Sequence, residues 1–154
     1  MIRTVLAGAA AVLTLALAAA PAAQAQTPAP AATADTTLTV HLRGLTPGKG
    51  AVILMLFDNN DNYEASKPVQ SAKVDATGMA VDSIFTGLTP GRYAVKVFYD
   101  INGNGVYDQG TDYIGFSNHV DMTDTNHVPT YSETSFMLKA GANTQQITVA
   151  RVRS

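Results

Sequence analysis

Hydrophobic residues that recur at every second position are the strongest constraint on how this chain can fold. Leu38, Val40 and Leu42 alternate with polar neighbours, which is typical of a strand that buries one face and exposes the other. The stretch 51–57 (AVILMLF) is apolar at every position, as in a central strand covered on both sides. No window of ten or more residues has a helical period, and only residues 60–66 could form a helical turn.

The same reasoning predicts further strands over residues 79–85, 92–99, 135–139 and 145–152. Turns rich in Gly, several of them also with Pro, separate the strands and supply the backbone angles that tight reversals need. Short strands punctuated in this way predict an all-β fold, an antiparallel β-sandwich of about seven strands. A small barrel is the alternative.

The N-terminus has a different composition. Arg3 is followed by an Ala-rich apolar run, and Ala23-Gln24-Ala25 offers the small-x-small pattern at which signal peptides are cut. A membrane anchor needs ~20 strongly apolar residues, and this run is shorter and poorer in Leu and Ile. Residues 1–25 are therefore predicted to be a cleaved signal peptide, and the protein is expected in the periplasm or outside the cell.

Residues 26–36 are polar and rich in Ala and Pro, so we expect a disordered linker before a single domain over 37–154. The chain has no Cys, which excludes disulfides, thiolate metal clusters and a cysteine nucleophile. Its formal net charge of −2 argues against nucleic acid as a partner. We expect a monomer without an integral membrane segment after signal removal.

One loop carries a metal-binding pattern. Residues 100–108 (DINGNGVYD) match the first nine positions of a calcium loop, D-x-[DN]-x-[DN]-G, with Gly105 at the position of the sharp turn. Calcium takes six to eight oxygen ligands. The predicted ligands are the side chains of Asp100, Asn102, Asn104, Asp108 and Asp112 and the carbonyl of Val106.

The loop departs from the helix–loop–helix form of this motif in two respects. Position twelve is Thr111 instead of Glu, so that the adjacent Asp112 would close the shell, and the element before the loop is a strand. With at most three carboxylates, the expected dissociation constant is on the order of 10⁻⁴–10⁻³ M. The alternative is that the Asn-Gly pairs simply form turns that need no ion.

An internal repeat provides a comparison for this loop. GLTPGK followed by AVILMLFD at 44–58 resembles GLTPGR followed by YAVKVFYD at 87–100. Asp58 in the first copy corresponds to Asp100, but Tyr63 stands where the second copy has Gly105. A bulky residue disfavours the positive φ of that turn, so the first copy is predicted not to bind an ion.

Residues 113–132 have no clear periodicity, and loops of this length are usually functional or disordered. One alternative function is therefore a binding module that uses this loop to hold a glycan or a protein, with the aromatic side chains Tyr107, Tyr113 and Tyr131. The loop also holds His119, Asp121, Asp124 and His127, which could form a transition-metal site, but their spacing matches no tight ligand pair, and we expect solvated side chains.

A small hydrolase that uses His119 or His127 is a third alternative. Ser117 and Ser132 lie nearby in the sequence, but no nucleophile motif surrounds either of them, and a triad is defined by geometry and not by sequence distance. We therefore expect a protein without catalytic activity.

The segment from Gly87 to Asp100, the Asn-Gly pairs that follow it, GFSN at 115–118 and PTYSETSF at 129–136 resemble a bacterial exported family known as domain of unknown function 2141. The resemblance covers residues 37–152 and implies export and a β fold, with no established activity. The GLTPGRY segment is also similar to transthyretin-like and collagen-adhesin sandwich modules, some of which bind calcium in a D-x-N-x-N-G loop. The expected fold is therefore a transthyretin-like or immunoglobulin-like sandwich.

Overall fold

The computed structural model describes residues 35–120 and 127–151. The predicted signal peptide and the predicted linker up to residue 34 lie outside the described residues. β1 begins at Thr36, one residue before the predicted start of the domain, and this residue is only 3% exposed.

Nine strands and two short helices make up the described part of the chain. In order they are β1 (Thr36–Arg43), β2 (Ala51–Phe57), α1 (Asn60–Glu64), β3 (Gln70–Asp75), β4 (Ala80–Leu88), β5 (Gly91–Asp100), β6 (Tyr113–Phe116), α2 (Tyr131–Thr134), β7 (Phe136–Leu138), β8 (Ala142–Thr148) and β9 (Ala150–Arg151). Neither helix is long and apolar enough to cross a membrane, among the residues described.

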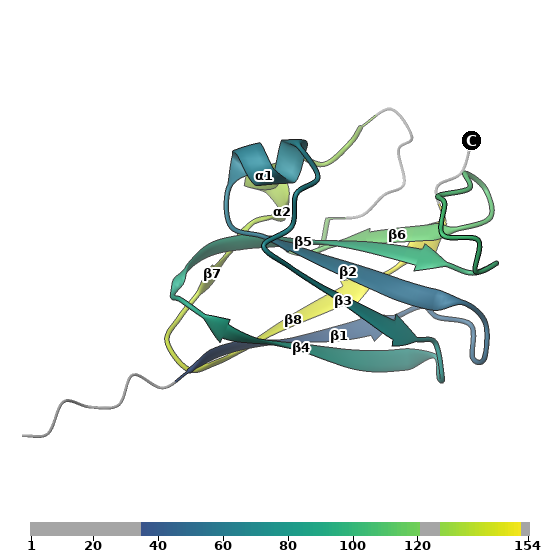
Figure 1. Cartoon of the computed structure of the whole chain (residues 1–154), viewed down its shortest axis with the longest axis horizontal. Helices are drawn as coiled ribbons and strands as arrows, with labels where there is room; N and C mark the ends of the chain where they lie inside the picture. The colour runs from purple at the N-terminus through teal and green to yellow at the C-terminus, as the bar shows by residue number, and fades with distance from the viewer. Residues whose placement is uncertain (1–34, 121–126, 152–154) are drawn as a thin grey trace, which may run out of the picture. The chain divides into compact units, whose positions relative to one another are not determined.

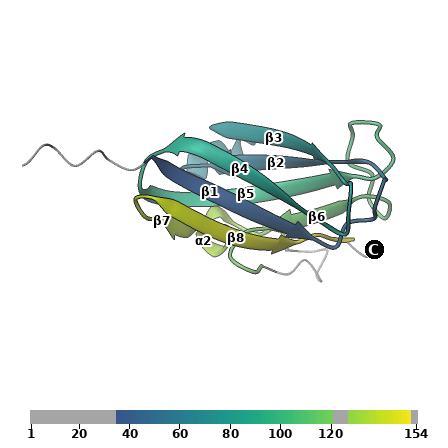
Figure 2. The ribbon, with the colours of Figure 1, turned by 90° about the horizontal axis from the view of Figure 1, so that it is seen from below.

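The strands form two sheets that face each other (Figures 1 and 2). The smaller sheet has the order β4-β1-β8, and the larger has the order β3-β2-β5-β6-β9, with β7 also paired to β5. The predicted all-β sandwich is thus confirmed, with nine strands instead of about seven. One pair departs from the antiparallel prediction, because β1 and β8 run parallel from Thr37↔Ala142 to Arg43↔Thr148.

The core lies between the sheets and is built by the predicted alternation. Leu38, Val40 and Leu42 of β1 are fully buried. On β5, the side chains of Tyr93, Val95, Val97 and Tyr99 all point into the same core. Burial of one such aliphatic side chain contributes about 1.5–3 kcal/mol, so these two strands carry much of the stability of the sandwich.

Three elements were not predicted. β3 is an edge strand whose inward face holds only two small apolar residues, Ala72 and Val74, half-buried against the core, so its sequence (QSAKVD) shows only a weak alternation. β6 lies within residues 113–132, which were predicted to be one loop, and α2 begins there and ends at Thr134. β6 has only four residues, one of them Gly115, and forms because β5 offers it a partner from Lys96 to Tyr99. The helical turn predicted within 60–66 is confirmed as α1.

The two copies of the internal repeat become neighbouring strands. β2 and β5 pair antiparallel, with Ala51 opposite Asp100 and Phe57 opposite Ala94. The segments that follow the two strands therefore lie at opposite ends of the larger sheet, with α1 and α2 at one end and the loop after β5 at the other (Figure 1).

Candidate functional site

The predicted calcium loop begins where β5 ends. Asp100 is the last residue of β5 and is 4% exposed. Gly50 lies directly against its backbone, and a Cβ atom at Gly50 would overlap the carbonyl oxygen of Asp100. Gly50 also has a φ of +68°, a conformation that side chains with a Cβ rarely adopt. The start of the loop is therefore held against the turn before β2.

The backbone of the loop wraps around the carboxylate of Asp100. Oδ1 accepts a hydrogen bond from the amide of Gly103 at 2.7 Å, and Oδ2 accepts one from the amide of Gly105 at 2.8 Å. Both glycines have a positive φ, +75° and +79°. The carboxylate at the first motif position, Asp100, is thus joined by a hydrogen bond to the glycine at the sixth, Gly105.

Three further predicted ligands converge on one point inside the loop. The side-chain amides of Asn102 and Asn104 both donate to Oδ2 of Asp108, at 2.8 Å and 2.6 Å. The amide oxygens of the same Asn residues accept from the backbone, Asn102 from Asn104 at 3.1 Å and Asn104 from Val106 at 2.8 Å. Motif positions three, five and nine therefore share one centre, while the side chain of Val106 is exposed.

Asp112 closes the loop. Its side chain is completely buried, and its two oxygens accept hydrogen bonds from the amides of Ile101 at 3.1 Å and Asp108 at 2.8 Å. The carboxylate thereby ties the first residue after β5 to the far side of the loop. Thr111, the residue at the formal twelfth position, is exposed.

Two buried carboxylates at one loop are an unusual electrostatic arrangement. Within the described residues, no Lys, Arg or His nitrogen lies within 4.0 Å of Asp100 or Asp112. Buried charges are normally paired, hydrogen-bonded or bound to a metal, and here backbone amides take that place. The described part of the chain holds no group of three or more acidic or His side chains arranged as a metal cluster, so an ion would depend on the two Asn residues and on backbone oxygen.

The first copy of the motif has a different structure. Asp58 accepts hydrogen bonds from the side chains of Asn59 at 2.7 Å and Asn62 at 2.9 Å, and Asn59 caps the helix that follows. Tyr63, which replaces the glycine, is 2% exposed and packs edge-on against Phe57. The segment is a helical turn that anchors an aromatic side chain instead of a loop.

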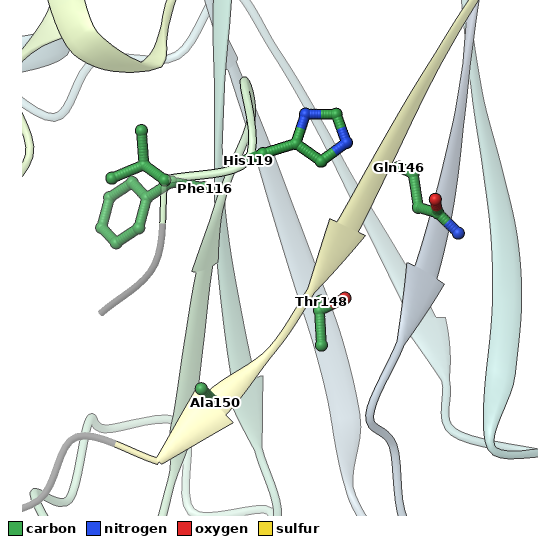
Figure 3. Close-up of a pocket in the computed structure, with 6 residues that line it drawn as sticks. Phe116, His119, Gln146, Thr148 and Ala150 are labelled. Carbon is green, nitrogen blue, oxygen red and sulfur yellow. The ribbon is translucent and has the colours of Figure 1, made fainter. Parts of the chain in front are cut away.

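The residues of the hydrolase alternative are not joined to each other. Ser117 is fully buried, where its hydroxyl donates to the carbonyl of Thr134 at 2.6 Å. His127 contacts Glu133 at 2.9 Å. His119 lines a hollow of about 330 Å³ (Figure 3), and the other residues around it are Phe116, Val120, Gln146, Thr148 and Ala150. Asp121 and Asp124 lie outside the described residues.

The three tyrosines of the binding-module alternative lie in different surroundings. Tyr107 is 42% exposed on the calcium-motif loop. Tyr113 packs against the core residue Tyr99, with the ring centroids 5.6 Å apart. Tyr131 is 9% exposed and lies against Tyr63 in the cluster formed by α1 and α2. They therefore form no common aromatic surface.

Lys96 was not singled out from the sequence. Its ammonium lies 3.6 Å from the ring centroid of Tyr63 and donates a hydrogen bond to the Tyr63 carbonyl at 2.8 Å. Burial lowers the pKa of Lys96, and the nearby carboxylate of Glu64 partly offsets that shift. The available signal was one Lys within the otherwise apolar strand YAVKVFY.

Comparison with models of protein families identifies the family of this chain. A model of a family described as uncharacterized proteins conserved in bacteria, DUF2141, matches residues 40–146. The chain belongs to this family. The matched region runs from β1 into β8 and includes the whole loop from Asp100 to Asp112. No curated protein and no solved structure matches the chain, so the transthyretin-like or immunoglobulin-like subtype of the DUF2141 sandwich stays a prediction.

Proposed function

We propose that this protein is an exported, non-catalytic β-sandwich that binds Ca²⁺ through the loop from Asp100 to Asp112. The observation that carries the proposal is the convergence of Asn102 and Asn104 on Asp108, because it brings three of the predicted ligands to one centre. The buried carboxylates on either side of that centre supply negative charge that no cationic side chain within 4.0 Å neutralises, among the described residues.

A small rearrangement gives the centre the chemistry of a calcium site. Each Asn presents its amide nitrogen to Asp108, and a half-turn about the last side-chain bond would present the oxygen instead. Calcium prefers carboxylate, amide and carbonyl oxygens, six to eight in number. The proposed ligands are those predicted from the sequence, with Asp100, Asn102, Asn104, Asp108 and Asp112 acting through side chains and Val106 through its carbonyl.

The same contacts keep the affinity low. An ion must displace the two amide hydrogen bonds to Asp108, and Asp100 and Asp112 are already used by backbone amides. A dissociation constant on the order of 10⁻⁴–10⁻³ M follows from this competition and from the small number of carboxylates. Such an affinity suits an extracellular or periplasmic protein and orders the loop more than it holds the sandwich together.

Thermal unfolding in calcium tests this proposal. With the proposed dissociation constant, about 10 mM Ca²⁺ stabilises the folded state by about 1.4–2.7 kcal/mol, which raises the melting temperature by several degrees. Magnesium at the same concentration should have a much smaller effect, because Mg²⁺ demands a rigid octahedral shell and loses its water reluctantly.

Two matched variants locate the effect. Asp108→Asn removes the charge at the point of convergence and should abolish the calcium-dependent rise. Asp58→Asn makes the same type of substitution in the first copy, at the position that corresponds to Asp100 and before a helical segment, and should leave the rise intact. An equal rise in both variants, or no rise in the unmodified protein, would contradict the proposal.

A further inference from the structure

The loop after β5 contains the only two Asn-Gly sequences of the chain, Asn102-Gly103 and Asn104-Gly105. All four residues are exposed to solvent. Asn is a chemically labile residue, and a following Gly makes it more so. The reason is that Gly has no Cβ to hinder the approach of its nitrogen and adopts a wide range of backbone angles. The sequence and the exposure of this loop therefore favour deamidation.

Deamidation is a reaction of the chain with itself and with water. The backbone nitrogen of the following residue loses its proton and attacks Cγ of the Asn side chain. The new C–N bond closes a cyclic imide, while the bond from Cγ to the side-chain nitrogen breaks and that nitrogen leaves as ammonia after taking up a proton. Water then opens the ring at either carbonyl group, which gives Asp or isoaspartate. The nitrogen of the following Gly must therefore be free to act as the nucleophile.

The carboxylate of Asp100 holds both of these nitrogens. Its Oδ1 accepts a hydrogen bond from the amide of Gly103 at 2.7 Å, and its Oδ2 accepts one from the amide of Gly105 at 2.8 Å. Asp100 is only 4% exposed, so that little water competes for it. The negative charge beside each N–H group disfavours loss of the proton. Asp100 therefore opposes the first step of the reaction at both pairs.

The carbon atoms under attack are held as well. The side-chain nitrogens of Asn102 and Asn104 donate to Oδ2 of Asp108, at 2.8 Å and 2.6 Å. Their side-chain oxygens accept from the backbone amides of Asn104, at 3.1 Å, and of Val106, at 2.8 Å. Each side chain must give up these contacts before its Cγ can meet the Gly nitrogen.

We propose that Asn102 and Asn104 are sites of spontaneous deamidation, and that Asp100 sets the rate by holding the two glycine nitrogens. Each conversion replaces an amide that donates to Asp108 by a carboxylate, so that like charges meet at the point where the loop is now closed. The loop therefore loses this contact as the protein ages. The inference goes beyond the proposed calcium site and does not depend on it.

Peptide mass spectrometry of the full chain, incubated at neutral pH in EGTA, measures the conversion of each Asn. A synthetic peptide of residues 100–108 provides the rate without the surrounding fold. The peptide should convert at both Asn residues. The folded chain should convert at the same two residues about tenfold to a hundredfold more slowly, because a hydrogen bond to a charged group must first break. Asn62, which precedes the bulky Tyr63, should stay unconverted.

Asp100→Asn tests the role of the carboxylate. The variant keeps the size of the side chain but has one acceptor oxygen in place of two, so at least one glycine amide loses its partner. Conversion of the Asn before that glycine should be about tenfold faster. Hydrogen exchange of the same glycine amide should become faster as well, which connects the rate to the hydrogen bond.

Asp112→Asn is the matched control. It alters the other buried carboxylate of the loop, whose partners are the amides of Ile101 and Asp108, and leaves the glycine amides with Asp100. Both conversion rates should stay close to those of the unmodified protein. Asn118 lies outside the loop, where its side chain donates to the carbonyl of Glu133 at 2.8 Å. Faster conversion of Asn118 in either variant would report general unfolding.

Several results would overturn the inference. Equal rates in the folded chain and the peptide, or unchanged rates in Asp100→Asn, would show that Asp100 does not set the rate. No conversion in the peptide, or none in the folded chain after about a hundred peptide half-lives, would show that these residues are not deamidation sites. If Asp100→Asn does not fold, hydrogen exchange in the unmodified protein decides, and unprotected amides of Gly103 and Gly105 would contradict the proposal.

Discussion

The ring of Tyr107 packs edge-on against that of Phe98, with the ring centroids 6.0 Å apart and the planes at 72°. Tyr107 lies between two proposed calcium ligands, Val106 and Asp108, and together with Phe98 it lines an apolar groove of about 350 Å³ on the larger sheet. The loop therefore contributes a side chain to this groove. We predict that calcium sharpens the aromatic signals of Tyr107 in NMR spectra, and that Asp108→Asn removes this response. Identical Tyr107 signals with and without calcium in the unmodified protein would disprove the connection.

Asp112 should contribute strongly to stability with or without an ion. Asp112→Ala leaves the amides of Ile101 and Asp108 without their acceptor, and the lost hydrogen bonds should cost about 2–3 kcal/mol. Urea unfolding in EGTA measures this loss. Asp75→Ala removes an exposed carboxylate at the end of β3 and should change the free energy of unfolding by less than about 0.5 kcal/mol.

Gly115 should tolerate no side chain. A Cβ atom there would lie 2.8 Å from Cγ2 of Ile147 and 3.2 Å from the carbonyl oxygen of Thr148, so Gly115→Ala must push β6 away from β8. Overpacking of this kind costs about 1–3 kcal/mol. Gly91→Ala is the matched control, because its nearest contact would be an ordinary 3.6 Å. Equal melting temperatures of the two variants would show that β6 can move freely.

The period of two was sufficient to predict the sandwich and its core, because hydrophobic residues recur at every second position along most of β1 and β5, from Leu38 to Leu42 and from Tyr93 to Tyr99. β3 and β6 could not be found in this way. The first is a polar edge strand, and the second is short and contains Gly115, so both depend on hydrogen bonds from a neighbouring strand. Helix α2 did have a local signal, the capping-box pattern of Thr130 and Glu133, but its four residues are too few to show a helical period.

The candidate site was predictable to a similar degree. Spacing alone placed Asp100 and Gly105 in their motif positions, because the backbone geometry of such a loop is local. The burial of Asp112 depends on how the loop returns to β6, and the aromatic surroundings of Lys96 depend on α1 and β5 meeting from distant parts of the chain. Neither of these two relations can be predicted from the residues that are adjacent in the sequence.

The hydroxyl of Tyr63 should matter for the position of the segment before α2. It donates to the carbonyl of Pro129 at 2.8 Å, and burial raises the pKa of Tyr63. Tyr63→Phe keeps the ring over Lys96 but leaves the carbonyl unpaired, at a cost of about 1–3 kcal/mol in unfolding free energy. Tyr107→Phe, at a largely exposed side chain, should have an effect below about 0.5 kcal/mol. An unchanged free energy of unfolding in Tyr63→Phe would mean that a water molecule replaces the hydroxyl as the hydrogen-bond donor to Pro129.

Glu133 should make the cap of α2 sensitive to acid. Hydrogen bonds from the backbone amide and hydroxyl of Thr130, together with His127, lower the pKa of Glu133 to about 2. In the unfolded chain a Glu titrates near pH 4.3. The stabilising contribution is therefore complete above about pH 4.3 and is lost as the pH falls toward about 2.

Carboxyl chemical shifts measured through an acid titration test this directly. The signal of Glu133 should have its midpoint near pH 2, and Thr130→Ala should move the midpoint upward toward about 4.3. A midpoint near the ordinary value in the unmodified protein would show that the capping box does not form in solution.

Calcium binding by the loop after β5 can be tested by a calcium titration followed by NMR. The backbone amide of Gly105 and the side-chain amides of Asn102 and Asn104 should shift together, with half-saturation on the order of 10⁻⁴–10⁻³ M. The signals of the first copy, around Asp58, should stay in place. Calcium binding at this loop would be contradicted if these three signals show no saturable shift up to about 10 mM calcium, or if Asp108→Asn gives the same curve.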